Sequence, residues 1–556
     1  MNSRGKHVWI VAAVLASVSL LLASCAPAAA PTPAAKTAPE ATKPVAKPAA
    51  PAPTAKPAAP APSPKPAAGQ PKYGGSVTRM RENYPDMLDP HLCRGANWWN
   101  DVLGPVYNGL LTLDEEMETV HDLVEKWEQP SDTQYVLHLR KGTKFHDTPE
   151  MKGRELTSED VKWNIERMAT DDKRMMRRWQ FQTITKIETP DKYTVKLTLK
   201  EPTAPFVSFM AQPYNYIVGK EAVEKYGDLI RHEAGTGPFC LKSWNEKISY
   251  KLAKNTNYFM KGVPYLDEVN VIIVPDAATR LAAFRSGRGD YVHVEPPDVA
   301  SLKKTNPSVT LSSQPRANVI MMFHPDKKPF TDQRVRQAFS LAIGRQELID
   351  IVMEGQGDIS GPVFGSVAAS WKLPPEELKR LYKVDIAKAK KLMAEAGYPD
   401  GFPLEVKVSS QRKDCMETII PVTEQLKQIG VQVKQQVLEH TTLVAQRNAG
   451  DYVCLLHAGT SCIEVGERIT QYWKTGGQYH LHDKDLDRLL EEQQRAVDTT
   501  KRRQIINQLE RLMIERAHVL FVYGYSVILA RQPNIKGPLE NSVFAQHLVA
   551  YQWIKE

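Results

Sequence analysis

The stretch FTDQRVRQAFSLAIGRQELIDIVM, residues 330–353, has the pattern of an amphipathic helix. Thr331 or Asp332 precedes the apolar pattern, at the place where a short polar side chain caps the first turn of a helix. An apolar stripe at helical spacing follows, formed by Val335, Ala338, Phe339, Ala342 and Ile343. We therefore predict a helix in FTDQRVRQAFSLAI, with one face packed against a core.

Three further stretches carry the same kind of local signal. DIAKAKKLMAEAGYPDGFPLEVKV (385–408) predicts a helix, a turn and a strand. LTSEDVKWNIERM (156–168) opens with Thr157 three residues before Asp160, which is the spacing of a capping box. YTVKLTLK (193–200) alternates apolar and polar residues, as a half-buried strand does. Together these patterns predict a mixed α/β protein, and the length predicts more than one lobe.

The N-terminus has the features of an export signal. Arg4 and Lys6 precede an apolar run, residues 8–23, which is too short to span a bilayer but suits a signal core. The run ends in LLASC (21–25), which resembles a bacterial lipoprotein box. In such a box Cys25 is lipidated and becomes the first residue of the mature protein; an ordinary signal peptide with a chance cysteine is the alternative. We expect residues 1–25 to be a lipoprotein signal peptide.

A tether is predicted to follow the signal. Residues 26–71 are mostly Ala, Pro, Lys and Thr, with too few apolar side chains for a core and too much proline for regular structure. About 46 residues near polyproline geometry reach on the order of 140 Å when fully extended. Such a disordered tether would let the body work at a distance from the membrane that holds its lipid anchor.

Most of the positive charge lies outside the body of the chain. Of the formal net charge of +8, Arg4 and Lys6 supply two charges, and the five lysines of the tether, less Glu40, supply four. The body is close to neutral, so the alkaline isoelectric point gives no argument for nucleic acid. Five cysteines follow Cys25 without the spacing of a disulfide framework.

Motifs of the common enzyme classes are missing from the sequence. It contains no G-x-x-x-x-G-K-[ST] loop, no H-E-x-x-H, no G-x-S-x-G and no C-x-x-C. The nearest candidates for a metal site are CLLHAGTSC (454–462) and YHLHD (479–483), and polar loop residues are the simpler interpretation of both. We expect no enzyme, no metal centre and no cofactor; a metal-dependent extracytoplasmic enzyme is the alternative from a different class.

Several motifs of the body resemble one family, the extracellular solute-binding proteins, family 5, which are the peptide and nickel receptors of ABC importers. The resemblance runs in the family's order from Tyr73 to the C-terminus. It is carried by residues 73–92, 106–128, 135–147, 235–244 and 254–292 and by the stretch quoted first.

The resemblance implies a two-lobed, periplasmic binding protein-like α/β fold of type II, cluster C, with a hinge and an extra subdomain. Lobe I would comprise residues 72–325 with the subdomain at 113–235, lobe II residues 326–525, and residues 526–556 would return to lobe I. It further implies a monomeric receptor that captures peptides between closing lobes and delivers them to a permease and its ATPase. A receptor for a nickel chelate or another small solute is the alternative within the family. The location implied is extracytoplasmic, in the periplasm or at the cell surface.

By the same resemblance, GDYVCLLHAGTSCIEVGERITQYW (450–473) faces the ligand from lobe II. Relatives usually carry W-x-x-x-x-D-P here; this chain has Thr460 near the tryptophan position and Glu464 or Val465 near the aspartate. The departure argues against recognition of a free N-terminus in the usual way, although Glu464 would still supply a carboxylate for a buried ammonium. His457, Thr460, Cys462 and Glu464 are the candidates from this lobe.

Lobe I supplies the facing candidates. The resemblance places Arg178 and Trp179 in the cleft, with Arg177 as the alternative to Arg178 if the register differs by one. The remaining candidates from this lobe are Tyr214, Asn215, Cys93, Asn97 and Trp98. Strand alternation from Asp451 to His457 would separate the side chains of Cys454 and His457, so we expect a cleft wall there rather than a metal cage.

Overall fold

The computed structural model describes residues 70–93, 100–175, 177–365, 369–459, 464–539 and 546–555, all within one unit of the chain, residues 55–556. The predicted export signal and nearly all of the predicted tether lie outside the described residues. Among the described residues, no helix combines the length and the apolar character needed to cross a bilayer.

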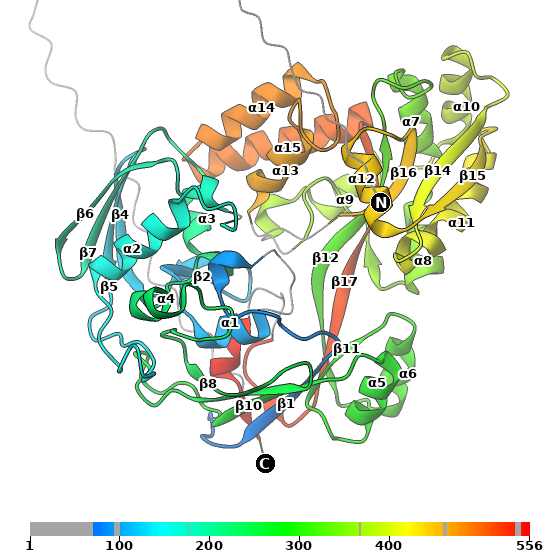
Figure 1. Cartoon of the computed structure of the whole chain (residues 1–556). Coiled ribbons are helices and arrows are strands. Elements are labelled where there is room, and N and C mark those ends of the chain that lie inside the picture. Colours follow the sequence, from blue (N-terminus) through cyan, green and yellow to red (C-terminus); the bar gives the residue numbers. More distant parts are fainter. Residues whose placement is uncertain are drawn as a thin grey trace, which may run out of the picture. The chain divides into compact units, whose positions relative to one another are not determined.

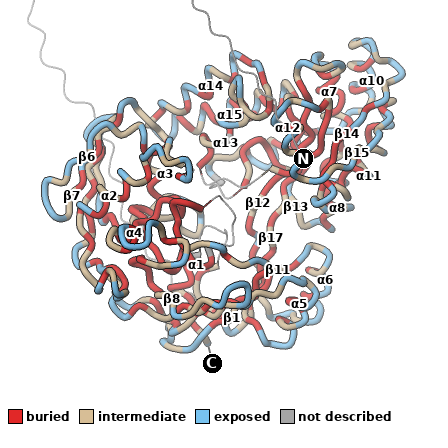
Figure 2. Tube along the Cα trace, viewed as in Figure 1, coloured by how far each residue is buried: buried red, intermediate tan, exposed pale blue. Residues whose placement is uncertain are grey.

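Two long antiparallel strands, β12 (Thr310–Phe323) and β17 (Val519–Arg531), lie at the centre of the main sheet (Figure 1). We call them the hinge pair. They pair from Thr310 opposite Arg531 to Met322 opposite Val519, with irregularities at Pro315/Ala317 and Val319/Ile320. Most residues of both strands are buried, as Figure 2 shows. The hinge pair therefore runs through the interior from one half of the main sheet to the other.

The main sheet has eleven strands in the order β15-β14-β16-β12-β17-β11-β1-β10-β9-β8, with β13 paired to β17. Beyond β17 lie β11 (Tyr291–Val294), β1 (Ser76–Arg81), β10 (Glu268–Ile273), β9 (Ser249–Lys254) and β8 (Phe239–Asn245). Beyond β12 lie β16 (Cys454–Ala458), β14 (Pro403–Ser409) and β15 (Gln432–Leu438), and β13 spans Gly357–Asp358.

The half that contains β1 and β8 shares its core with a second sheet, in the order β4-β5-β7-β6. Its strands are β4 (Val124–Ser131), β5 (Gln134–Leu139), β6 (Ile184–Asp191) and β7 (Thr194–Leu199). The helices on this core are α1 (Asn100–Val106), α2 (Ser158–Ala169), α3 (Phe206–Met210) and α4 (Lys220–Tyr226). A short hairpin, β2 (Leu111–Leu113) and β3 (Thr119–His121), lies between β4 and α1 in sequence. A separate small core lies under α5 (Ala277–Arg285) and α6 (Asp298–Thr305).

In the other half, side chains alternate along β12 and enter two cores on opposite faces of the sheet. Val319, Met321 and Phe323 belong to one core, and Ile320 and Met322 to the other. The first core is covered by α7 (Gln333–Ala342), α8 (Arg345–Met353), α10 (Ile386–Glu395) and α11 (Lys413–Lys427). The second is covered by α9 (Pro375–Leu381), α13 (Val465–Trp473), α14 (Lys484–Arg495) and α15 (Thr499–Arg516).

The local predictions are confirmed. The Thr157–Asp160 capping box opens α2, Asp332 caps α7, and residues 385–408 form α10, a turn and β14. The helix predicted in FTDQRVRQAFSLAI is α7, which ends at Ala342, and a second helix, α8, begins at Arg345. Gly344 separates the two helices, and glycine costs about 1 kcal/mol relative to alanine inside a helix.

Candidate ligand-binding site

A cavity of about 50 Å³ lies where the hinge pair meets α13. We call it the cleft cavity. It is lined mainly by aromatic and branched aliphatic side chains, with Asn318 as its polar side chain on β12. Its lining comprises Asn318, Pro362, Val363, Phe364, Gly459, Val465, Ile469, Tyr472, Trp473, Tyr479 and Phe521. Gly459 and four residues of α13 in this lining belong to the stretch 450–473, which therefore borders the cavity.

Gly459 allows the chain to approach β12 closely. Its N–H donates to the Asn318 carbonyl (2.8 Å), and a Cβ at this position would stand 2.8 Å from Asn318 Oδ1. The ring of Phe364 packs directly on Gly524 of β17, and a Cβ at position 524 would stand 2.1 Å from that ring. Side chains at either glycine would displace the cavity lining, so the two glycines define the shape of the cleft cavity.

The other half of the chain contributes a cationic and aromatic surface, which we call the facing wall: Cys93, Arg177, Trp179 and Tyr214. The Arg177 guanidinium lies 3.5 Å from the centre of the Tyr214 ring and donates to the Cys93 carbonyl (2.9 Å). Trp179 contacts Phe209 edge to face with 5.3 Å between ring centres, yet 46% of its surface is exposed. A large exposed aromatic side chain held by a neighbour is suited to stacking on a ligand.

Three buried side-chain amides form a hydrogen-bonded chain next to these residues. Asn215 donates to Gln180 Oε1 and to the Phe209 carbonyl, both at 2.8 Å, and Gln180 donates to Gln212 Oε1 (3.0 Å). All three amide side chains are at least 97% buried. The predicted site residue Asn215 therefore positions its neighbours through this network.

The amide chain ends in a contact between the two halves. Gln212 Nε2 donates to Glu467 Oε2 on the first turn of α13 (3.1 Å). Close by in sequence, the Ala204 N–H donates to the Gln494 carbonyl at the end of α14 (2.8 Å). These bonds hold the residues that flank α3 against α13 and α14.

The carboxylate of Glu464 is engaged within the chain. Its Oε1 accepts from Arg502 Nη2 (2.6 Å), and its Oε2 accepts from the Glu467 N–H (2.6 Å), which caps α13. Glu464 is 2% exposed and Arg502 4% exposed. The carboxylate of the half-buried Glu467, which the sequence analysis did not single out, accepts from Gln212 in the other half instead.

His457 and Cys454 have separate environments, as alternation predicted. Cys454 packs with Leu456 in one core. His457 Nε2 accepts from Arg447 Nη1 (3.0 Å), and burial together with the nearby Arg447 charge lowers the pKa of His457 to about 3. The imidazole is thus neutral and already bonded through Nε2.

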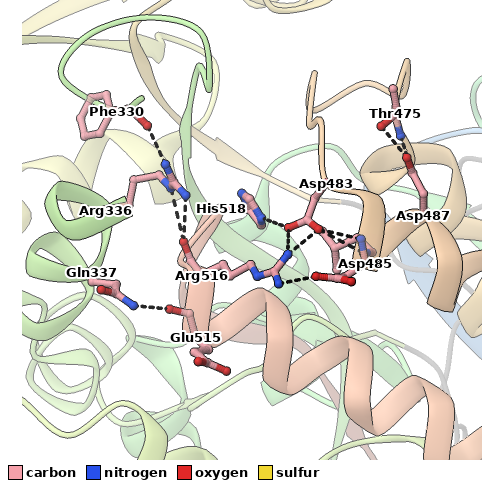
Figure 3. Close-up of polar contacts among 11 residues, drawn as sticks. Phe330, Arg336, Gln337, Thr475, Asp483, Asp485, Asp487, Glu515, Arg516 and His518 are labelled. Atoms are coloured by element: carbon pink, nitrogen blue, oxygen red, sulfur yellow. Dashed lines mark hydrogen bonds and ion pairs between the residues drawn. The ribbon is translucent and has the colours of Figure 1, made fainter. Parts of the chain in front are cut away.

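The two histidines of YHLHD also point to different partners. His480 Nε2 donates to the Arg447 carbonyl (3.0 Å), and His482 Nε2 lies 3.4 Å from Asp326 Oδ2. Asp483 caps α14 and accepts from Arg516 and His518, the network drawn in Figure 3. This stretch therefore anchors the start of α14 to the end of α15 and to His518, which precedes β17.

Of the remaining predicted site residues, Arg178 is half-buried in the short 3-10 helix Arg178–Gln180, next to Trp179. Asn97, Trp98, Thr460 and Cys462 lie outside the described residues. Sequence reasoning missed Gln180, Gln212 and Glu467. The signal for Glu467 was its place three residues after Glu464, on the first turn of a helix.

Comparisons with known proteins agree with this architecture. A family model described as bacterial extracellular solute-binding proteins, family 5 Middle, matches residues 118–478. The glutathione-binding protein GsiB of Salmonella choleraesuis (strain SC-B67) is 32% identical over 332 residues, which are 59% of this chain and 63% of the relative. The match thus covers less than two thirds of this curated relative's length.

Two solved structures share the fold. The PBP AgaA of A. tumefaciens R10, in complex with agropinic acid, has a TM-score of 0.69 and 25% identity, covering 87% of this chain and 99% of that chain. The periplasmic binding protein DppA of Helicobacter pylori, in complex with the peptide STSA, has a TM-score of 0.70 and 22% identity over the same shares. The periplasmic binding protein-like fold predicted from the sequence is confirmed, and the chain belongs to the bacterial extracellular solute-binding proteins, family 5.

Proposed function

We propose that the protein is the substrate-binding receptor of an ABC importer and that it captures a short peptide or peptide-like solute between its two halves. The observation that carries this proposal is the meeting of the facing wall with α13 through Gln212 and Glu467, on one side of the hinge pair. A ligand touching both halves stabilises their approach by the difference in its affinity for the two arrangements.

The chemistry of the site suits a small zwitterion. Arg177 and Arg178 offer cationic groups for a ligand carboxylate, Glu467 offers a carboxylate for an ammonium, and Trp179 and Tyr472 offer aromatic surface. The similarity to a glutathione-binding protein favours a tripeptide-like ligand with more than one carboxylate. An opine-like acid is the second candidate, favoured by the similarity to the agropinic acid complex.

The rest of the proposal comes from the sequence. Lipidated Cys25 would anchor the protein outside the cytoplasm, residues 26–71 would form the tether, and a permease with its ATPase would receive the ligand. The same proposal includes the predicted lobe boundaries at residues 325 and 525 and the predicted subdomain at residues 113–235. The protein would act as a monomer and would catalyse no reaction.

Calorimetric titration tests the ligand class. We expect saturable, one-to-one binding of glutathione or of di- and tripeptides, with agropinic acid and a nickel chelate as the competing probes. Mass spectrometry of ligand released from natively expressed protein checks the result independently. Saturable binding of the nickel chelate or of agropinic acid alone would replace the peptide class; no binding of any probe, and no co-purified solute, would contradict the receptor proposal.

A further inference from the structure

Three side chains with metal-binding atoms converge outside the cleft cavity and the facing wall. His146 lies in the segment after β5, Glu233 in the segment between α4 and β8, and Cys240 on β8. One nitrogen, one carboxylate oxygen and one sulfur all lie within 4.8 Å of one another. His146 is 2% exposed, whereas Cys240 is partly exposed, so the cluster is built into the protein but reachable from solvent.

The imidazole of His146 is oriented by the backbone. Its Nε2 donates to the Gly237 carbonyl (3.0 Å), which leaves Nδ1 facing Glu233 Oε2 at 2.7 Å. The His146 backbone N–H donates to the Gly235 carbonyl (2.8 Å) and ties the same loop to this segment. Metal-binding histidines characteristically donate their second ring N–H to a carbonyl or carboxylate, which fixes the tautomer and the ring plane.

The three groups are suitable ligands for one ion. An imidazole nitrogen, a carboxylate oxygen and a cysteine sulfur are all ligands that Zn²⁺ takes in proteins. Nδ1 of His146 is the ring nitrogen left for an ion, because Nε2 already donates to the Gly237 carbonyl. Metal binding requires the cysteine to bind as a thiolate.

We propose that His146, Glu233 and Cys240 form a site for a divalent metal ion of zinc-like chemistry. Zn²⁺ binds thiolate sulfur at about 2.3 Å, imidazole nitrogen at about 2.0 Å and carboxylate oxygen at about 2.1 Å, and three protein ligands leave a fourth position for water. Ligand atoms already within 4.8 Å need only small side-chain movements to reach this geometry. The ion would clip the 233–240 segment to the segment around His146. The site is independent of the function proposed above.

The test uses the full chain after treatment with a chelator and titration with Zn²⁺. We expect one equivalent to bind and the melting temperature to rise. Cys240→Ser keeps the size of the side chain and should weaken binding on the order of 100-fold, because even second-sphere changes cost 10- to 100-fold. Glu233→Gln should weaken it less, and affinity in the wild-type protein should rise with pH. Co²⁺ should give a thiolate charge-transfer band that Cys240→Ser abolishes.

Cys415→Ala is the matched control, since it removes a buried thiol from another core. His482→Ala removes a surface imidazole near Asp326. Neither change should affect Zn²⁺ binding. The proposal is overturned if the chelator-treated protein takes up no Zn²⁺, if Cys240→Ser binds as the wild type does, or if His482→Ala removes the binding. We avoid substituting His146, because its hydrogen bonds also hold the loop.

Discussion

Glu464 and Glu467 lie three residues apart at the start of α13, but their carboxylates have different partners. Glu464 is buried against Arg502, whose Nε and Nη2 also donate to Gln493 Oε1 (3.2 and 3.0 Å). Glu467 accepts from Gln212, across the candidate site. Breaking a buried ion pair leaves an uncompensated charge, whereas under the proposed function a change of the half-buried Glu467 carboxylate acts on ligand binding. The two residues therefore separate stability from affinity.

We predict that Glu464→Gln lowers the free energy of unfolding by about 3 kcal/mol, the scale for removing one partner of a buried pair. Denaturant unfolding measures this loss. Glu467→Gln should leave stability nearly unchanged but weaken a cationic or zwitterionic ligand by about 2 kcal/mol, as calorimetry would show. The reverse pattern, with affinity lost in a stable Glu464→Gln protein and retained in Glu467→Gln, would show that Glu464 binds the ligand ammonium.

At the scale of elements, α15 holds a loop of the cleft cavity through one buried acid. Glu510 is fully buried, and its two carboxylate oxygens accept from the Val363 and Leu373 N–H groups, both at 3.0 Å. These residues flank 366–368, and Val363 lines the cleft cavity. Burial raises the pKa of Glu510 from 4.5 to about 8, although the two backbone hydrogen bonds act to lower it.

This shift predicts a pH-dependent stability. Between about pH 4.5 and pH 8 the folded protein holds a proton on Glu510 that the unfolded chain has lost, so the free energy of unfolding should fall as pH rises through this window and level off above it. Glu510→Gln should remove that part of the slope. Asp122, whose burial raises its pKa to about 7, contributes a similar slope in both proteins. Parallel unfolding curves for the two proteins across this range would refute the assignment to Glu510.

The elements also show how far the sequence predicts the structure. Capping residues and alternation predicted α2, α10, β7 (Thr194–Leu199) and the separation of Cys454 from His457, because these signals are local. The hydrogen bond from the Gly344 N–H, between α7 and α8, to Gln425 Oε1 (3.0 Å) was not predicted, because the two residues lie far apart in the chain. The pairing of Glu464 with Arg502 was missed for the same reason: it is a tertiary contact with no local trace.

At the scale of the whole molecule, the two halves are joined through the paired strands of the hinge pair. Contacts between the halves include Gln212 with Glu467, and Glu118, which accepts from Ser370 Oγ (3.0 Å) and lies 3.9 Å from Arg503 Nη2. Glu118 immediately precedes β3, whereas Arg503 is on α15. Exposed contacts such as those of Glu118 are worth about 0–1 kcal/mol each, so they can bias an equilibrium between arrangements without locking it.

We therefore predict that saturating ligand reduces the radius of gyration in small-angle scattering while helix content, followed by circular dichroism, stays the same, because the halves rotate as bodies about the hinge pair. Glu118→Gln removes a contact between the halves without touching the site, so it should weaken ligand up to about fivefold, the equivalent of about 1 kcal/mol, and enlarge the ligand-free protein. Glu116→Gln is the matched control, an exposed carboxylate two residues away that should change neither quantity. An unchanged radius with verified, saturating ligand would contradict the hinge mechanism, and equal effects of the two substitutions would assign the change to surface charge instead of closure.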